Sequence, residues 1–187
     1  MKFYLTASTT TNNIYNILDS SIITHKGSSA ITDYQNNSEY LYFELVFPEL
    51  KRNDPGIGIY LDYNILKDYD FYYFSDKGNK IKFPKKNIYK RLEQIEEKYL
   101  KKRNKLWSET GEWLNDGYYF ITKSPVVIEK NIRFISKPNT KKDEKKLKKI
   151  LKNKYPKAKM LVKDDRLDYS TIPKNPEFEK KIKKMEK

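Results

Sequence analysis

The feature that most constrains the fold is a set of short aromatic and β-branched runs in the first half of the chain. Residues 40–47 (YLYFELVF), 57–63 (IGIYLDY) and 71–75 (FYYFS) have the composition of β-strands. The segments NILKD and DKGNK, which follow the last two runs, predict a helical turn and a tight turn. Residues 56–80 therefore predict core strands. Their scarcity of positive charge suits a sheet facing a buried helix, or the wall of a cleft for an aromatic ligand.

Helices and further strands are predicted on both sides of this region. Apolar residues recur at helical spacing over residues 14–23, 86–106 and 140–155. Further strands are predicted at residues 2–7, 117–122, 126–135 and 158–164. The mixed order contains few β-α-β units and predicts an α+β fold, with a mixed, mostly antiparallel sheet and flanking helices. We expect a single domain over residues 1–164 and a basic C-terminal tail over residues 165–187.

The charge of the chain is distributed unevenly. The net charge of the 187 residues is +14, but residues 1–80 hold 7 Lys and Arg against 10 Asp and Glu, whereas residues 81–187 hold 32 against 15. A lysine-rich half is attracted to phosphate backbones by counterion release, without sequence preference. A plainer interpretation is that an AT-rich genome inflates Lys, Asn, Ile and Tyr, and that the lysines are solvated. The candidate phosphate contacts are Lys142, Lys145, Lys146 and Lys149 in the predicted helix 140–155.

Composition excludes several classes of site. The chain has no cysteine and one histidine, which excludes disulfides, thiolate metal sites and a multi-histidine metal centre. Six glycines and the absence of GxGxxG or Walker A spacing argue against a phosphate-binding loop. No run approaches a membrane span, and the N-terminus lacks the apolar core of a signal peptide. We expect a cytoplasmic protein with no metal and no membrane partner.

Two carboxylates lie beside tryptophans and are candidates for acid–base catalysis. Glu109 and Glu112 belong to SETGEW, next to Trp107 and Trp113. An apolar wall can raise the pKa of a carboxyl group toward neutrality. The competing interpretation buries the tryptophans and leaves the acids in water. It is favoured because large aromatic side chains are mostly buried and acids mostly exposed.

Other catalytic constellations have weaker support in the sequence. A nuclease would need several carboxylates to hold Mg²⁺, and the available ones are Asp62, Asp76, Asp164 and Asp165. Their spacing gives no convincing PD-(D/E)xK motif. His25 lies in the predicted loop THKGSS, where a single histidine is more often a surface residue than part of a triad.

The order of the predicted elements is similar to that of a known family. The first segment is a predicted strand that leads through threonines into a predicted helix, FYLTASTTTNNIYNILDSSII. Thr6 lies in the strand part of this segment. Two predicted strands joined by a loop that contains Arg52 follow, in YLYFELVFPELKRNDPGIGIYLDY, and a third is in FYYFSDKGN. The later segments of the layout are RNKLWSETGEWL, VVIEKNIRFI and AKMLV. Over about residues 2–163 this layout resembles the DarT-type ADP-ribosyltransferases, which modify DNA bases using NAD. The resemblance rests on layout more than on identity.

The resemblance implies an ADP-ribosyltransferase-like fold, an NAD cofactor and a set of site residues. It implies that Thr6 and Asn12 contact the NAD ribose or amide, that Arg52 contacts the pyrophosphate, and that Glu112 is the catalytic carboxylate. The chain departs from the family at Tyr4, which stands where the family has the histidine of its His-x-Thr motif. The glutamate has two possible positions: Glu112 fits the family's local motif, whereas spacing to the next strand places Tyr119 there.

Two functions without chemistry compete with this enzyme hypothesis. In the first, the basic half binds nucleic acid through lysines while tyrosines stack on bases. In the second, the acidic, aromatic residues 56–80 dock a basic protein partner, since tyrosine-rich patches are frequent at interfaces. Small lysine-rich proteins of either kind suit phage or mobile-element roles, such as inhibiting a nucleic-acid-guided machine.

Overall fold

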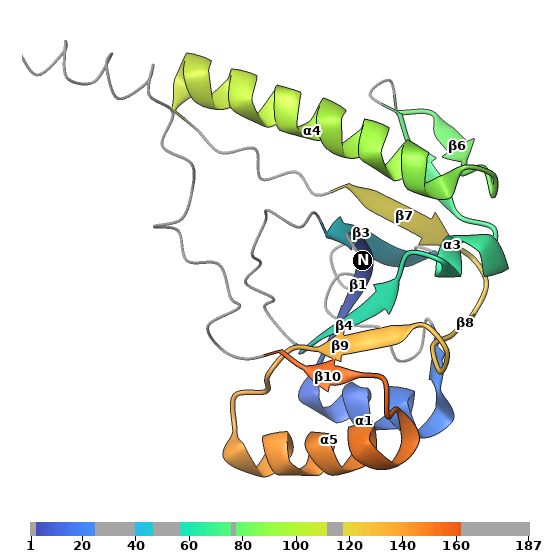
Figure 1. Cartoon of the computed structure of the whole chain (residues 1–187), viewed down its shortest axis with the longest axis vertical. Helices are drawn as coiled ribbons and strands as arrows, with labels where there is room; N and C mark the ends of the chain where they lie inside the picture. Colours follow the sequence, from blue (N-terminus) through green and yellow to red (C-terminus); the bar gives the residue numbers. More distant parts are fainter. Residues whose placement is uncertain (1–2, 25–39, 47–56, 76–77, 112–117, 162–187) are drawn as a thin grey trace, which may run out of the picture.

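One sheet joins most of the strands of the molecule. The computed structural model describes residues 3–24, 40–46, 57–75, 78–111 and 118–161, except for the side chain of Trp107. The strands of the sheet are β1 (Tyr4–Thr9), β3 (Leu41–Val46), β4 (Ile57–Asp62), β5 (Tyr72–Phe74), β6 (Lys80–Lys82), β7 (Tyr119–Thr122), β9 (Ile132–Ile135) and β10 (Lys159–Met160). Their order is β10-β9-β4-β1-β3-β7-β5-β6, and all neighbours pair antiparallel except β9 and β10, which are parallel (Figure 1).

Helices cover the two ends of this sheet. The helices are α1 (Thr11–Ser20), α3 (Ile65–Asp68), α4 (Ile88–Thr110) and α5 (Lys141–Lys154), and a small second sheet pairs β2 (Ile22–Ile23) with β8 (Val126–Val127). Figure 1 shows α4 beside β7, and α1 and α5 side by side next to β9 and β10. Apolar residues of all these regions form one core cluster. The predicted single domain with a mixed, mostly antiparallel sheet and flanking helices is therefore confirmed for the described residues.

The central strand β1 separates its side chains between two faces. Successive side chains of a strand point to opposite faces, so Leu5 and Ala7 share one face and Tyr4, Thr6 and Ser8 share the other. Leu5 and Ala7 are buried in the common core with the inward residues of α1, α4 and α5. The second face is polar and aromatic. It is the face on which the predicted Thr6 site lies.

The first helix is shifted toward the N-terminus relative to the prediction of residues 14–23. The Oγ1 atom of Thr10 accepts a hydrogen bond from the Asn13 N–H at 3.3 Å, so Thr10 caps α1 as the preceding threonines suggested. The helix ends at Ser20 because Ser21 adopts a left-handed conformation with φ 60°. Ile22 and Ile23, whose spacing suggested helix, instead pair with β8.

The prediction of a strand over residues 126–135 was wrong in its extent. The segment forms β8 and β9, which belong to different sheets. Between them the N–H groups of Asn131 and Ile132 donate to the carbonyl of Ile128 at 2.9 and 2.8 Å, which closes a turn. Strand β6 falls where only a turn was predicted, and α4 extends beyond the predicted end of the helix at residue 106. These differences arise because strand boundaries depend on partners that are distant in sequence.

Two further expectations concern the ends of the chain and the membrane. The predicted tail, residues 165–187, lies outside the described residues, so its boundary with the domain stays a prediction. None of the helices in the described part of the chain is long and apolar enough to cross a membrane.

Candidate functional site

Thr6 lies in the middle of the polar face, on the central strand. Its register partners are Glu44 on β3 and Tyr60 on β4, so the hydroxyl is enclosed by strands on both sides. The residue is 3% exposed, and its Oγ1 atom has no hydrogen-bond partner among the described residues. A buried hydroxyl without a partner is destabilising relative to a bonded one. Thr6 therefore carries a buried hydroxyl whose hydrogen-bonding capacity the described residues leave unused.

Tyr4 is two residues before Thr6 and shares its face. Its ring packs edge-on against Phe134 of β9, with ring centroids 5.3 Å apart. Burial raises the pKa of the Tyr4 phenol, and the negative charge of Asp62 raises it further, while Arg133 opposes the shift. The phenol therefore stays protonated at neutral pH and can donate a hydrogen bond. Tyr4 thus offers a donor on the face that also carries Thr6.

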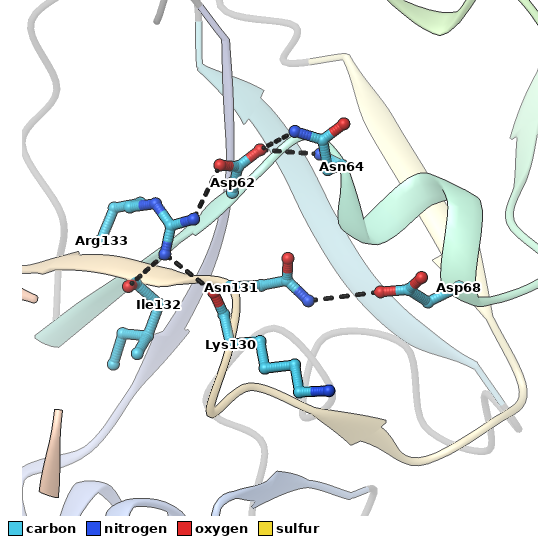
Figure 2. Close-up of polar contacts among 7 residues, drawn as sticks. All are labelled: Asp62, Asn64, Asp68, Lys130, Asn131, Ile132 and Arg133. Carbon is cyan, nitrogen blue, oxygen red and sulfur yellow. Dashed lines mark hydrogen bonds and ion pairs between the residues drawn. The ribbon is translucent and has the colours of Figure 1, made fainter. Parts of the chain in front are cut away.

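An ion pair fixes the edge of this face, between β4 and β9. Asp62 is 2% exposed, and its Oδ2 atom accepts from Nη2 of Arg133 at 3.0 Å (Figure 2). The other carboxylate oxygen accepts from the backbone N–H and the side-chain amide of Asn64, at 2.9 and 2.8 Å. Nη1 of Arg133 donates to the carbonyls of Lys130 and Ile132. Both partners are satisfied within the protein, which is the condition for a buried ion pair to persist.

This network removes Asp62 from the predicted set of metal ligands. Both oxygens of its carboxylate are already engaged, and the described residues contain no group of three His, Cys, Asp or Glu that could hold a metal. Asp76, Asp164 and Asp165, the other carboxylates of the nuclease hypothesis, lie outside the described residues. Nothing in the described part of the chain therefore assembles a Mg²⁺ site.

The remaining residues implied by the family resemblance are not brought together in the described structure. Asn12 is the second residue of α1, is exposed, and makes no hydrogen bond to Thr6. Arg52 and Glu112 lie outside the described residues, so their roles stay predictions. Tyr119, the second candidate for the glutamate position, is the exposed first residue of β7 and pairs in register with Glu44.

The acid–base candidates beside the tryptophans are only partly described. Glu109 is exposed near the end of α4, and Lys105 lies 3.8 Å from it one turn earlier. This agrees with the interpretation in which that acid faces water. Trp113 and His25 lie outside the described residues, as does the side chain of Trp107.

The four predicted phosphate-binding lysines do lie together, on α5. Their positions differ by three, four and seven residues, which places them on one side of a helix. All four are exposed, opposite the buried Leu147. We call this surface the α5 lysine stripe; it consists of Lys142, Lys145, Lys146 and Lys149. The stripe confirms the predicted geometry of the helix, whereas its function stays a prediction.

The carboxylates of α5 form their hydrogen bonds and ion pairs with residues outside the stripe, although the charges of Lys142 and Lys146 also help to lower the pKa of Asp143. Glu144 pairs with Lys148 at 2.6 Å and with Lys137 at 3.2 Å, which lowers its pKa. Asp143 accepts hydrogen bonds from Thr140 and Tyr15, each at 2.6 Å, and these two bonds are the main reasons that its pKa is lowered. Three lysines of the stripe, Lys142, Lys145 and Lys149, form no ion pair with a described carboxylate.

Contacts between α1 and α5 hold the stripe in place. Nζ of Lys146 lies 3.7 Å from the centre of the Tyr15 ring, a cation–π contact. The Tyr155 hydroxyl donates to the Leu18 carbonyl at 2.6 Å, and Lys154 donates to the carbonyls of Leu18 and Asp19. A cation at the C-terminal end of α1 is favourably placed relative to the helix dipole. The stripe is thus attached to a helix whose orientation is fixed.

Sequence reasoning missed Arg133 as part of the polar face. Arg133 is 71 positions from Asp62, and no local pattern links the two residues. Arg133 is the second residue of β9, and only the pairing of β9 with β4 places it beside Asp62.

Comparisons with family models, curated proteins and solved structures gave no match to this chain. The fold class is therefore established by the structure alone, and function has to be argued from the sites described above.

Proposed function

We propose that the protein binds nucleic acid through the α5 lysine stripe. The observation that carries the proposal is the exposure of four lysines on one side of a fixed helix, with the helix's own carboxylates engaged elsewhere. The stripe from Lys142 to Lys149 spans about 10 Å at 1.5 Å per residue. Charges presented over this length can contact successive phosphates and release their counterions.

The expected binding is electrostatic and independent of base sequence. The four residues of the stripe are all lysines, with no aromatic ring or side-chain amide among them. They can contact phosphates but do not recognise the edges of particular bases. The logarithm of the affinity should fall linearly with the logarithm of the salt concentration, for duplex and for single strand alike. This sets the proposal apart from a protein partner, whose binding would depend much less on salt.

The test is a salt titration of the full chain against a labelled duplex. The triple variant Lys142→Gln/Lys145→Gln/Lys149→Gln should lower the slope of log affinity against log salt by roughly 2 to 3, at about 0.9 per phosphate contact. The matched control is Lys67→Gln/Lys86→Gln/Lys130→Gln, which removes three exposed lysines elsewhere and changes the net charge equally. Equal slopes for the two variants would refute the stripe as the binding surface.

We also propose a second candidate function, an ADP-ribosyltransferase-like activity that uses NAD and acts on nucleic acid. The observation that favours it is the buried Oγ1 of Thr6, which has no hydrogen-bond partner in the described part of the chain and shares a sheet face with a protonated Tyr4. An NAD ribose hydroxyl or amide is a group that this oxygen could bond. When bound, NAD would supply the ADP-ribose to be transferred. The roles of Asn12, Arg52 and Glu112 rest on the family resemblance alone.

Thermal unfolding with and without NAD tests this second candidate. Millimolar NAD should raise the melting temperature of the wild-type chain. Thr6→Val, which removes the hydroxyl at nearly constant volume, should abolish the rise. Transfer of label from NAD to DNA, RNA or protein should be lost in Glu112→Gln. A wild-type chain that NAD does not stabilise would eliminate the enzyme proposal and leave the α5 proposal intact.

A further inference from the structure

A groove lies at the end of the sheet away from α5, between α4 and the β5–β6 hairpin. Its volume is about 660 Å³, within the range of roughly 300–1,000 Å³ that is usual for ligand sites. Figure 1 shows β6 beside the first half of α4, at the opposite end of the molecule from α5. Five aromatic residues line the groove: Tyr73, Phe74, Phe83, Tyr99 and Tyr118.

Part of this aromatic lining is fixed by ring contacts. The ring of Tyr73 lies 6.2 Å from that of Phe83 and 6.0 Å from that of Tyr118, and Phe83 packs edge-on against the buried Phe120 at 4.9 Å. Phe74 differs from these residues: it is 49% exposed, and because it follows Tyr73 in β5 and pairs with Lys80, its ring belongs to the opposite face of the hairpin. The aromatic floor of the groove is therefore formed by the residues that share the face of Tyr73 and Ile81.

The charge of the groove has one sign. Arg91, Lys98 and Lys102 line it from α4, at intervals of seven and four residues that place them along one side of the helix. Helix α4 also contains four glutamates, and none of them lines the groove. Arg91 and Lys102 form no ion pair within the described residues. The side of α4 that faces the groove is therefore a row of cations about 16 Å long.

We propose that this groove is a binding site for single-stranded nucleic acid. Bases stack on Tyr73, Tyr99 and Tyr118, and phosphates lie along Arg91, Lys98 and Lys102. Aromatic platforms beside a cationic track are the features by which proteins hold single strands without sequence preference. The proposal rests on the proposed nucleic-acid binding and extends it, because it assigns unpaired strands to a surface separate from the α5 stripe.

An acidic protein segment is the other occupant that the charge would allow. A helix docked in a groove is anchored mainly by apolar side chains that fill aliphatic pockets. Here aromatic rings outnumber isoleucines five to two in the lining. The three tyrosines of the lining, Tyr73, Tyr99 and Tyr118, are only half-buried. These observations favour a base over a peptide side chain.

The experiment compares a labelled oligothymidylate with a duplex of the same length, using fluorescence anisotropy on the full chain. Tyr73→Leu should weaken oligothymidylate binding on the order of tenfold, as expected for one lost stacking contact, and should leave duplex binding unchanged. Arg91→Gln/Lys102→Gln should lower the single-strand salt slope by roughly 1.4, at about 0.7 per contact. Matched controls are Tyr72→Leu, the neighbouring tyrosine on the opposite face of β5, and Lys86→Gln/Lys90→Gln, all outside the groove.

Several outcomes would overturn the groove proposal. It fails if Tyr73→Leu leaves oligothymidylate binding unchanged, or if it weakens duplex binding equally. It also fails if a polyglutamate peptide binds the wild type but not Tyr73→Leu while oligothymidylate binds both, since the occupant is then protein. The α5 triple variant separates the two proposals. Unchanged duplex binding in that variant refutes the stripe, whereas the Tyr73→Leu result alone decides the groove.

Discussion

The two ends of the molecule each present a lysine-rich amphipathic helix, but they build different surfaces from it. At one end, α5 packs against α1 and directs its lysines outward, with its carboxylates held by Thr140, Tyr15 and neighbouring lysines. At the other end, α4 directs its cations toward an aromatic groove beside an edge hairpin. A flat row of charge can contact phosphates only, whereas a charged groove with open rings can also hold bases.

The difference comes from what each helix lies beside. The α5 stripe borders Tyr15, whose ring is already covered by Lys146. The cations of α4 border rings that lie in β5 or next to the ends of β6 and β7, and these are the last three strands at one edge of the sheet. Similar helical sequences therefore acquire different binding capacity from their neighbours, and variants at the two ends should behave differently.

The largest effect is expected from removing the aromatic support of the groove. Phe83 is buried against Tyr73 and Phe120, so Phe83→Ala should lower the free energy of unfolding by about 3–5 kcal/mol. It should also weaken oligothymidylate binding. Leu147→Ala, beneath the α5 stripe, should lower the free energy of unfolding by about 2–5 kcal/mol and leave that binding intact. Urea denaturation measures the two losses of stability, and fluorescence anisotropy measures oligothymidylate binding. If Leu147→Ala stays folded but binds oligothymidylate more weakly, the proposed difference between the two ends of the molecule is wrong.

A smaller effect is expected at the buried ion pair between β4 and β9. Asp62→Asn should lower the free energy of unfolding by about 2 kcal/mol, less than for a fully buried pair because Arg133 is 25% exposed. The double variant Asp62→Asn/Arg133→Met should recover part of this loss. At the groove end, Asp70→Asn removes two exposed ion pairs with Lys82 and Lys85 and should leave urea unfolding nearly unchanged. Equal effects of Asp62→Asn and Asp70→Asn would contradict the assignment of a structural role to the buried pair.

Combining the binding variants tests whether the two surfaces act independently. The α5 triple variant and Arg91→Gln/Lys102→Gln change surfaces at opposite ends of the sheet, with no shared partner among the described residues. Their effects on the logarithm of oligothymidylate affinity should therefore add. Duplex affinity should follow the α5 substitutions alone. Anisotropy titrations of the combined variant decide this, and a combined effect no larger than that of one set would indicate a single shared surface.

The smallest effect concerns alkaline pH at the contact between α1 and α5. Burial, followed by the hydrogen bond to Asp143 and its charge, raises the pKa of Tyr15 to about 12. The folded state therefore favours the neutral phenol. This contribution is fully present below the ordinary pKa of 10 and is lost as pH rises from 10 toward 12. Tyr15→Phe should unfold with a shallower dependence on pH in that window, as measured by urea midpoints.

A residual alkaline dependence is expected in Tyr15→Phe, because burial also raises the pKa of Tyr155. The matched control is Tyr155→Phe, which should keep the contribution of Tyr15. An unchanged pH dependence in Tyr15→Phe would show that the bond to Asp143 does not contribute in solution.

The sequence predicted the elements better than their boundaries and partners. Helical periodicity located α1, α4 and α5, and aromatic runs located β3, β4 and β5, because these signals are carried by neighbouring residues. The short strands β2 and β6 were missed, since two or three residues carry too little pattern. Of the candidate site residues, the α5 lysines were placed together correctly because one helix spaces all of them.

The sequence by itself determined the alternation of β1, the cap of α1 and the lysine stripe, which follow from local geometry. Only the tertiary structure decided that Arg133 meets Asp62, that Thr6 is enclosed without a hydrogen-bond partner among the described residues, and that Tyr73 and the cations of α4 line one groove. The physical reason is strand pairing: these contacts depend on which strands become neighbours in the sheet. That order is set by packing of the whole core, and no short stretch of sequence encodes it.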